Sequence, residues 1–518
     1  MRKRSLPQPE ERTERRISAA ASLSICALTV IAQIVLTLAL TQLLAEKISY
    51  VYFILELAGA VVAIWVYLRP GSPSYKLVWM CLLLALPVAG MILFLLWGGS
   101  HQAKSLSLRK VAPPVERESA RQASAANVAH LSRRSPAWGR LASYLQSRDF
   151  LLYGGSQARY FAEGADFFDD LVLHLQRAEI YIFLEYYILA EGQIWDRIFH
   201  VLRERAAAGV EVRIIFDDFG NLTRFSDASL QALQDAGVEV EVFNPVHRYV
   251  NRIYFNYRDH RKIAVIDGVH AYTGGINIAD EYANLFVRFG HWKDTAILLR
   301  GETVQSFTLM FLQMWNLTEK EPRWDEALLP SPPVEAEGYV MPYCDCPLDD
   351  YKVGESVYMD ILNRAKDYVH IMTPYLILDN EMETALKFAA QRGVDVKLIL
   401  PGIPDKKLVY MITRSYYQQL HRAGVKIYEY RPGFLHAKTI VSDDDTAVVG
   451  TINMDFRSLY LHFECAAYIY RNPVVFDVER DFEETLKKCS LITMEDCKNY
   501  SWMGKKLGRL MRLVAPLM

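Results

Sequence analysis

The stretch His260-Arg-Lys262-Ile-Ala-Val-Ile-Asp267, followed by Gly274-Gly-Ile-Asn277, occurs twice in this chain. The second half repeats it with identical spacing, as His436-Ala-Lys438-Thr-Ile-Val-Ser-Asp443 followed by Gly450-Thr-Ile-Asn453. Five fixed positions recur by chance in roughly one chain in 10⁴ of this length, when each residue type has average usage. The repeat therefore indicates a duplicated unit, in which each copy carries half of a candidate active site.

The segments around each copy repeat as well. In the first half, 179–188 predicts a buried strand, 196–208 has helical periodicity, and 210–216 predicts a second buried strand. The same order recurs at 368–372, 381–391 and 394–400. Strands separated by helices of this length pair in parallel, so we expect an α/β fold. It would contain two similar α/β domains, each of which carries one copy of the repeated stretch.

Composition sets the expected domain boundaries of this 518-residue chain, which is too long for one ordinary core. A basic tail covers 1–16 and an apolar region covers 17–98. A polar stretch rich in Ala, Ser and Arg indicates a linker over 99–140, and a stretch rich in Glu and Pro indicates another over 319–340. We therefore expect the first domain over 141–318 and the second over 341–518.

Three apolar runs lie in the N-terminal region, at about 17–44, 48–68 and 77–97. Each has about the 20 residues that cross a hydrocarbon core, and aromatic residues mark the ends. We therefore expect three transmembrane helices. Basic clusters precede the first run and follow the third, so the distribution of positive charge does not fix which side of the membrane carries the domains.

Charge and cysteine content exclude some classes of function. The formal net charge of −2 gives no general attraction to nucleic acid, whose binding proteins need a basic stripe. The seven cysteines are odd in number, and Cys344-Asp-Cys346 is too tightly spaced for a paired-cysteine zinc site. We expect free thiols in a reduced compartment.

The repeated stretch has the chemistry of a phosphodiester site. A histidine and a lysine two residues apart point to the same face of a strand, the Gly-Gly or Gly-Thr pair supplies a tight turn, and the asparagine amide is a donor. Together the two copies would form a cationic pocket in which one imidazole attacks phosphorus and the other protonates the leaving alkoxide. The candidate residues are His260, Lys262, Gly275, Asn277, His436, Lys438, Thr451 and Asn453.

A nucleophilic imidazole needs an acceptor on its other nitrogen, usually a carboxylate. Asp294, downstream of the first copy, and Glu464, downstream of the second, are the candidates for orienting the histidines. Asp267 and Asp443 belong to the repeated stretch and enter the catalytic candidate set. They fall just beyond their strands, however, and this position favours a turn or ion-pair role over a catalytic one.

The two copies resemble the paired motifs of the phospholipase D superfamily. The segments 258–268, 274–282, 436–438 and 450–459 are similar to bacterial cardiolipin synthases, and so is the apolar hairpin from Tyr52 to Trp97. The resemblance covers nearly everything from Ile48 onward, while the first apolar run goes beyond the two-span pattern of these enzymes. It implies two similar phospholipase D-like α/β/α sandwich domains with one active site at their interface. It also implies a covalent phosphohistidine intermediate, no metal and no cofactor.

Motif positions carry the roles of the family over to this chain. His260 becomes the nucleophile by analogy and His436 the acid for the leaving group, although the sequence itself does not distinguish them. Lys262, Lys438, Asn277 and Asn453 would hold phosphate oxygens.

The implied reaction joins two phosphatidylglycerol molecules into cardiolipin and releases glycerol, at a bacterial inner membrane with the domains on the cytoplasmic side. The expected partners are phospholipids and the membrane, not nucleic acid; a homo-oligomer, the acyl-chain preference and the identity of the second lipid stay open. A membrane-anchored phospholipase D that hydrolyses headgroups shares every catalytic residue and is the alternative. The C-terminal segment 502–518 mixes apolar and basic residues, which indicates either an interfacial helix or a helix docked on its own domain.

Overall fold

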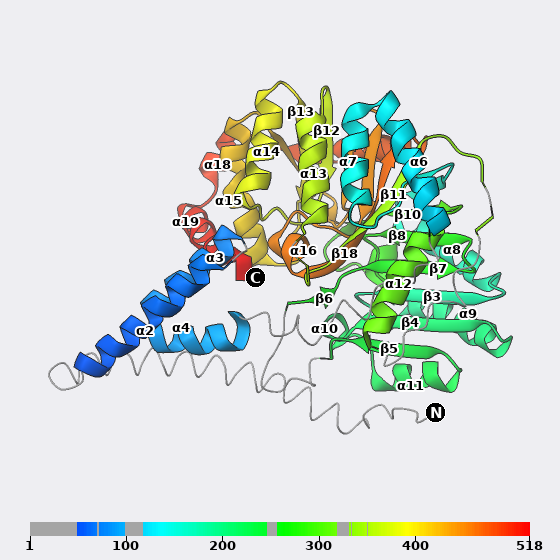
Figure 1. The fold of residues 1–518 in the computed structure, drawn as a ribbon, viewed down its shortest axis with the longest axis horizontal. Helices are drawn as coiled ribbons and strands as arrows, with labels where there is room; N and C mark the ends of the chain where they lie inside the picture. The colour runs from blue at the N-terminus through cyan, green and yellow to red at the C-terminus, as the bar shows by residue number, and fades with distance from the viewer. Residues whose placement is uncertain are drawn as a thin grey trace. The chain divides into compact units, whose positions relative to one another are not determined.

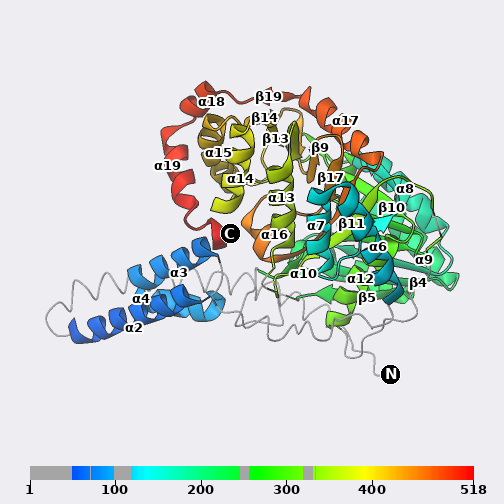
Figure 2. The same cartoon turned by 45° about the horizontal axis from the view of Figure 1, so that its top comes forward.

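The structure, a computed structural model, describes residues 49–69, 72–98, 118–245, 256–318, 331–332, 334–349 and 351–517. The chain divides into two compact units. One contains the N-terminal helices, and the other comprises Leu108–Phe243 and Tyr257–Arg509 and therefore both copies of the repeated stretch. Figures 1 and 2 show the ribbon in two views.

The N-terminal unit is helical. It contains α2 (Ser49–Leu68), α3 (Pro73–Ala85), α4 (Pro87–Leu93) and a π-helical turn (Phe94–Gly98), whose apolar side chains cluster around Trp79 and Leu83. The predicted span at 77–97 is not one continuous helix. Leu86 leaves the helical conformation, because Pro87 has no N–H to donate and instead begins the next helix.

Within the described residues, no helix combines the length and the apolarity that crossing a bilayer requires. The predicted transmembrane helices are therefore not confirmed, and the first of them, at 17–44, lies outside the described residues.

The larger unit contains two mixed sheets that repeat one another. The first has the strand order β2–β10–β8–β7–β3–β4–β5, and the second contains β11–β18–β17–β16–β12–β13–β14 in the corresponding order. The strands of the first sheet are β2 (Gln157–Phe161), β3 (Tyr181–Tyr186), β4 (Glu211–Asp217), β5 (Glu239–Phe243), β7 (Lys262–Ile266), β8 (His270–Gly274) and β10 (Ala296–Arg300). Those of the second are β11 (Tyr339–Asp345), β12 (Tyr368–Met372), β13 (Asp395–Pro401), β14 (Lys426–Tyr430), β16 (Thr439–Ser442), β17 (Thr446–Gly450) and β18 (His462–Tyr470).

The sequence predicts that the strands pair in parallel, and the structure confirms this for only part of each sheet. β3, β4 and β5 pair in parallel, as do β12, β13 and β14, whereas the remaining neighbours are antiparallel. The antiparallel part includes the strands that carry the repeated stretch. β7 and β8 are joined by a short turn at Asp267-Gly268, and β16 and β17 by one at Asp443–Asp445, so each pair forms a hairpin.

Helices cover the parallel strands as predicted. α9 (Gln193–Ala207) joins β3 to β4, and α14 (Asn380–Gln391) joins β12 to β13, each within a few residues of its predicted bounds. α11 (Asp227–Asp235) and α15 (Lys407–Arg422) make the next crossovers. Figure 1 shows α13 (Val353–Arg364), α14 and α15 side by side over the second sheet.

The two halves share one core. α12 (Val304–Thr318) packs on β7 and β3 of its own sheet and on β11 of the other, and α17 (Val474–Leu486) packs on β12 and β16 and reaches β2. Phe183 and Phe311 from the first half join Val449 and Cys465 from the second in a single buried cluster. The described part of this unit is therefore one body in which the two sheets are fixed against each other.

The predicted linker over 99–140 is helical where the structure describes it. α6 (Glu118–Arg134) and α7 (Pro136–Gln146) fold back on the larger unit, where the Trp138 ring lies 4.2 Å from that of Tyr470. The alanines of this segment favour a helix, Glu118 lies in its first turn and Arg133 and Arg134 in its last, as the helix dipole prefers. Low hydrophobicity in the sequence concealed this helix.

Candidate functional site

Each repeated histidine lies in a connection that runs along the other half of the unit. His260 follows β6 (Arg258–Asp259), which pairs in parallel with β18, and its N–H donates to Phe463 O at 2.9 Å. His436 follows β15 (Gly433–Leu435), which pairs in parallel with β9 (His291–Lys293), and its N–H donates to Lys293 O at 2.7 Å. Both side chains are thereby anchored at the junction of the two halves.

The carboxylates that meet these imidazoles come from the opposite half. His260 Nδ1 lies 2.9 Å and 3.0 Å from the two carboxylate oxygens of Glu464, and His436 Nδ1 lies 2.7 Å from Asp294 Oδ2. Both carboxylates are fully buried. Glu464 and Asp294 are thus brought to the histidines as the sequence suggested, but the pairing is exchanged between the copies. An Nδ1–H that donates to a carboxylate leaves Nε2 of each ring available for chemistry.

Gly275 and Thr451 support the carboxylates instead of facing a phosphate. A Cβ atom at Gly275 would collide with Asp294 Oδ1, whereas the Thr451 hydroxyl donates to Glu464 Oε2. Their backbone N–H groups donate to Thr295 O and Cys465 O, each at 2.9 Å. The donors of these two residues are thus used within the protein, and this favours support of the carboxylates over the predicted phosphate contact.

The two lysines place their charges beside both imidazoles. Lys262 Nζ donates to His260 O at 2.6 Å, and Lys438 Nζ donates to His436 O and lies 2.9 Å from His436 Nδ1. Burial lowers the pKa of Lys262 to about 8 and that of Lys438 to about 7.

Burial is also the main cause that holds the pKa of His260 and of His436 well below the usual value of 6.5. The charges of Lys262 and Lys438 both act on each ring in the same direction. The two copies therefore form one electrostatic site, in which the free protein keeps both imidazoles neutral near pH 7.

The two asparagines are not equivalent. Asn277 Oδ1 accepts the N–H of Ile188 at 3.0 Å, and its amide nitrogen donates to the Tyr282 hydroxyl at 2.6 Å. Asn453 is also buried, and its Oδ1 has no hydrogen-bond partner among the described residues. Asn453 is the better candidate for a substrate contact, while Asn277 ties the end of β3 to the 3-10 helix Asp280–Ala283.

The contacts of Asp267 and Asp443 favour the structural role over the catalytic one, as their position in the sequence does. Each takes the left-handed conformation, with φ of 53° and 51°, in the turn after its strand. The Asp267 carboxylate accepts the N–H groups of Glu179, Ile180 and Tyr181, all at 2.8 Å. The Asp443 carboxylate accepts those of Lys366, Asp367 and Tyr368, at 2.8–3.0 Å. They fasten the start of β3 and of β12, at the strand ends away from the histidines.

Asp267→Ala is expected to lower the free energy of unfolding by about 1–3 kcal/mol, because it removes the acceptor of three N–H groups. Alanine also tolerates the left-handed conformation less well than aspartate does. Thermal unfolding measures the loss, and activity per folded molecule should stay at the wild-type level. Asp169→Ala, at an exposed aspartate paired with Arg197, is the matched control. A large loss of activity in the folded Asp267 variant would favour the catalytic role instead.

Several aromatic side chains around the site had not been predicted from the sequence. The His436 ring is surrounded by Tyr282, Trp292 and Phe434, at 5.5–5.7 Å between centroids. Tyr187 and His462 flank His260 at 5.1 Å and 5.6 Å. One signal was present: His462 precedes Glu464 by two residues, so both point to the same face of β18.

Two groups of His and Glu lie close enough to be tested as metal sites within the described residues. They are His260, His462 and Glu464, and His370, Glu479 and Glu483. In both, the histidine Nδ1 is 2.9 Å from a carboxylate oxygen, as in a hydrogen bond. Ligands around a tetrahedral zinc with bonds of 2.0–2.2 Å are separated by about 3.4 Å. The residues present fit hydrogen-bonded pairs better than a metal.

Comparison with known proteins agrees with this fold. A family model described as "Cardiolipin synthase, PLD-like domain" matches residues 171–315 and 358–486, and one described as "Phospholipase_D-nuclease N-terminal" matches 58–99. A cardiolipin synthase from Alkalihalophilus pseudofirmus is 34% identical over 465 residues, which cover 88% of this chain and 92% of that one. An uncharacterized protein from Streptococcus mutans is 51% identical over 380 residues, which cover 73% and 82%.

Among solved structures, a phosphatidylserine synthase from Haemophilus influenzae superimposes with a TM-score of 0.56 at 14% identity and covers 73% of this chain and 100% of that one. At this identity the likeness establishes the fold alone. The family matches and the relatives over most of the chain establish the family. The chain belongs to the bacterial cardiolipin synthases of the phospholipase D superfamily, and it is an enzyme of that family.

Proposed function

We propose that the enzyme transfers a phosphatidyl group from one phosphatidylglycerol to a second, and so makes cardiolipin and glycerol at the bacterial membrane. One observation carries the proposal. Two buried imidazoles, each hydrogen-bonded through Nδ1 to a carboxylate of the opposite half, share the charges of two lysines. A phosphodiester supplies the negative charge that this donor-rich site lacks.

In the first step, His260 Nε2 attacks the phosphorus of one phosphatidylglycerol, an N–P bond forms, and the bond from phosphorus to the headgroup glycerol oxygen breaks. His436 supplies the proton that the departing glycerol takes. In the second step, His436 removes the proton from the terminal hydroxyl of another phosphatidylglycerol. The resulting oxygen attacks phosphorus, the N–P bond breaks, and cardiolipin leaves with His260 neutral again.

The surroundings of each imidazole suit these roles. Glu464 stabilises the positive charge that develops on the His260 ring when it becomes the phosphohistidine. His436 Nδ1 lies within hydrogen-bond distance of both Lys438 Nζ and Asp294 Oδ2. Burial raises the pKa of Asp294 to about 7 and lowers that of Lys438 to about 7. This group can hold one proton near pH 7 and deliver it through His436. We assign the phosphate oxygens to Lys262 and to the amide N–H groups of Asn453, whose Oδ1 can accept a substrate hydroxyl.

A lipid-product assay tests the proposal. The purified enzyme is incubated in vesicles of phosphatidylglycerol, and the products are resolved by mass. Cardiolipin with an equal amount of glycerol supports the transferase. Phosphatidic acid as the main product would indicate the hydrolytic alternative, in which water takes the place of the second lipid. Adding phosphatidylethanolamine as a second lipid shows which hydroxyl acceptors the site admits.

Near neutrality, kcat/KM is expected to fall as the pH rises but not as it is lowered. On the acid side, His260 must be unprotonated, and its pKa lies well below 6.5, so activity persists below pH 6.5. On the alkaline side, Lys438 and Lys262 lose their protons through about pH 7 and 8, and activity falls with them. Initial rates of glycerol release between pH 5 and 9 measure both limbs.

Lys438→Arg serves as the control for this profile, because a guanidinium keeps its proton throughout the range. The variant should be slower but should shift or lose the limb at pH 7. An unchanged alkaline limb in Lys438→Arg would assign that limb to another group, and an acid limb centred above pH 6.5 would contradict a neutral His260.

A further inference from the structure

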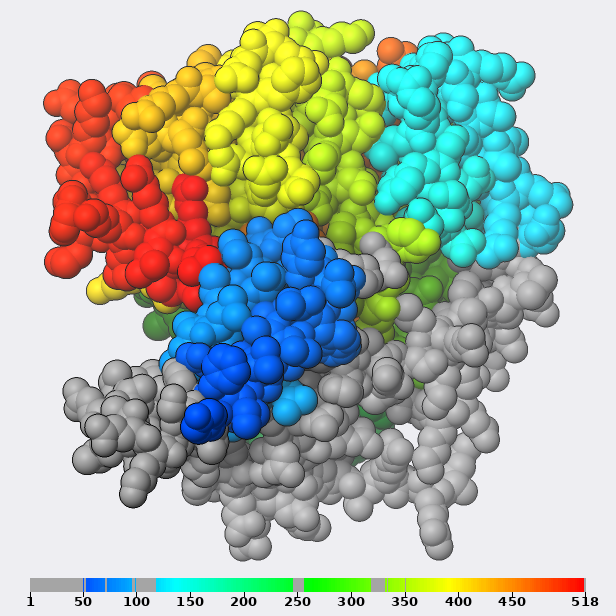
Figure 3. All heavy atoms as spheres, turned by 60° about the vertical axis from the view of Figure 1, so that its left-hand side comes forward, coloured from blue at the N-terminus to red at the C-terminus, as the bar shows by residue number. Residues whose placement is uncertain are grey.

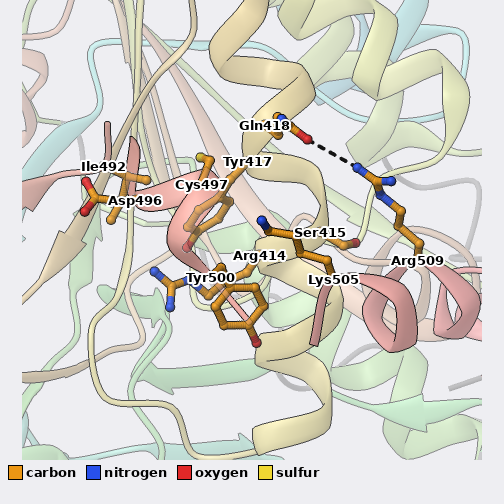
Figure 4. Close-up of a pocket in the computed structure, with 10 residues that line it drawn as sticks. All are labelled: Arg414, Ser415, Tyr417, Gln418, Ile492, Asp496, Cys497, Tyr500, Lys505 and Arg509. Atoms are coloured by element: carbon orange, nitrogen blue, oxygen red, sulfur yellow. Dashed lines mark hydrogen bonds between the residues drawn. The ribbon is translucent and has the colours of Figure 1, made fainter. Parts of the chain in front are cut away.

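The C-terminal helix α19 (Trp502–Met511) packs on the domain through its glycines. Gly504 and Gly508 are its buried residues, and a Cβ atom at Gly508 would lie 2.6 Å from Met411 O in α15. Arg509 Nη2 donates to Gln418 Oε1 at 3.2 Å, which fixes the other edge of the contact (Figure 4). The helix is thus docked on its own domain, as one sequence interpretation held, without using its large apolar side chains.

Those apolar side chains face away from the protein. Trp502, Met503 and Leu510 are 70%, 72% and 64% exposed, and Leu507 is 40% exposed. Met503, Leu507 and Leu510 follow the spacing i, i+4, i+7 and therefore form one stripe, with Trp502 beside it. Figure 3 shows the C-terminal segment in red on the surface, next to the orange and yellow of α15 and α14. A contiguous apolar face of this kind marks an interaction surface.

The polar side of α19 is basic. Lys506 borders the stripe, whereas Arg509 and Lys505 lie farther around the helix, and Lys505 Nζ donates to Lys498 O at 2.6 Å. α19 contains Lys505, Lys506 and Arg509 and no acidic residue. Lys506 Nζ lies 4.1 Å from the centroid of the Trp502 ring, so charge and aromatic surface adjoin. Lys505 and Arg509 also line a hollow with Arg414 of α15 and with Tyr500, which lies just before α19 (Figure 4).

Asp496, which lines this hollow, and Glu429, which pairs with a lining arginine, are both already engaged. Asp496 accepts the N–H and the hydroxyl of Thr493, at 2.8 Å and 2.6 Å, in the cap of α18 (Met494–Asn499). Glu429 pairs with Arg414 at 3.4 Å. The surface of α19 therefore combines an apolar stripe with an excess of positive charge.

We propose that α19 is a membrane-contact helix, whose apolar stripe enters the interfacial layer of the bilayer while Lys505, Lys506 and Arg509 bind the phosphates of anionic lipids. Apolar and basic residues in this arrangement are typical of helices that lie in the membrane interface. Charge complementarity selects an anionic lipid surface as the occupant. The proposal goes beyond the phosphatidyl transfer and does not depend on it, and the contact would hold the domain at the surface from which its lipids come.

Quenching of Trp502 fluorescence tests the contact in the full-length protein. The protein carries His260→Ala so that no turnover occurs. The emission of Trp502 is obtained by subtracting the spectrum of a matched protein that also carries Trp502→Phe. Vesicles contain phosphatidylglycerol or phosphatidylcholine with brominated acyl chains. We expect strong quenching in phosphatidylglycerol, weaker quenching in phosphatidylcholine, and a several-fold reduction when Lys505, Lys506 and Arg509 are all replaced by Gln.

The controls separate the possible outcomes. Phe476 is 54% exposed on α17, which lies apart from α19 in Figure 2, and a Phe476→Trp reporter should not be quenched. Absence of quenching at Trp502 in phosphatidylglycerol overturns the proposal. An emission shift that depends on protein concentration and not on the brominated lipid also overturns the proposal, because a second copy of the protein would then cover the helix. Equal quenching in both lipids overturns the role of the basic residues. Cardiolipin formation by the unmodified enzyme is measured separately, so failure of the chemistry is distinguishable.

A second inference concerns His462. It is independent of the membrane contact of α19, and it rests on the proposed function. Its side chain is buried beside His260, and neither ring nitrogen has a hydrogen-bond partner among the described residues. Glu464 Oε1 lies 3.8 Å from its Nδ1, beyond hydrogen-bond distance. Burial lowers the pKa of His462 to about 3, so the ring is neutral and offers one donor and one acceptor.

We infer that His462 positions the substrate by hydrogen-bonding a glycerol hydroxyl of phosphatidylglycerol, a group that both donates and accepts. His462→Phe should raise KM for phosphatidylglycerol about tenfold or more with a smaller effect on kcat, while His462→Asn, which keeps a donor and an acceptor, should recover most of the loss. Equal KM values for wild type and His462→Phe, in an enzyme that makes cardiolipin, would overturn the inference. Absence of cardiolipin from the wild type would instead overturn the proposed function.

Discussion

Replacing His260 or His436 by alanine is expected to lower cardiolipin formation by roughly 10³-fold or more, since residues that act as one catalytic unit lose most activity when either is removed. His260→Ala removes the atom that forms the N–P bond, and His436→Ala removes the group that moves the proton. Mass measurement of cardiolipin and glycerol from phosphatidylglycerol vesicles gives the rates. Substantial turnover by either variant would refute the two-histidine mechanism.

The two variants should differ in one respect. Attack on phosphorus does not require His436, so the His436→Ala protein should slowly acquire a phosphatidyl group from labelled lipid, whereas His260→Ala should acquire none. Labelling in the opposite pattern would make His436 the nucleophile. Either alanine leaves a buried carboxylate without its imidazole, so the folded fraction is measured alongside. His200→Ala, at a histidine with a side chain 60% exposed on α9, is the control that should keep full activity.

The residues of each repeated stretch could be predicted from the sequence because they lie close together along the chain. His260 with Lys262, and His436 with Lys438, lie two residues apart, and the apolar run that follows each pair belongs to the buried strand β7 or β16. This short spacing keeps each lysine beside its histidine, where the lysine Nζ donates to the histidine carbonyl, although each histidine lies before the strand, whereas the sequence predicts that it lies within it. The duplicated order of strands and helices was readable for the same reason, since hydrophobic periodicity is a property of short segments.

The rest depended on contacts between distant segments, which no spacing encodes. The exchange of Glu464 and Asp294 between the halves follows from the parallel pairing of β6 with β18 and of β15 with β9. The requirement for glycine at Gly275 becomes visible only when Asp294 is seen against its Cα. Likewise, α6 has few apolar residues, and its helical state is evident only where Val128 and Leu131 are buried.

Glu464→Gln and Asp294→Asn are each expected to lower the rate by about 10²–10⁴-fold, because an amide in place of the carboxylate no longer fixes the Nδ1–H form of the facing imidazole. The exchanged pairing predicts different defects. Glu464→Gln should slow the labelling of His260 by lipid, since Glu464 stabilises the charge on that ring. Asp294→Asn should leave labelling less affected and slow the release of cardiolipin. Rates unchanged by both substitutions would remove these carboxylates from the mechanism.

The exchange itself can be tested without relying on activity. In double-mutant cycles of unfolding free energy, His260→Gln with Glu464→Gln should show a coupling of about 1–3 kcal/mol, as residues in direct contact do. His436→Gln with Asp294→Asn should behave alike. His260→Gln with Asp294→Asn joins residues from the same half and should be additive within about 0.5 kcal/mol. Coupling within each half and additivity across the halves would contradict the exchange. Because each imidazole would then keep its own carboxylate, a single half would hold a complete histidine–carboxylate pair. The exchanged arrangement makes that impossible, so neither half of the chain can form the site alone.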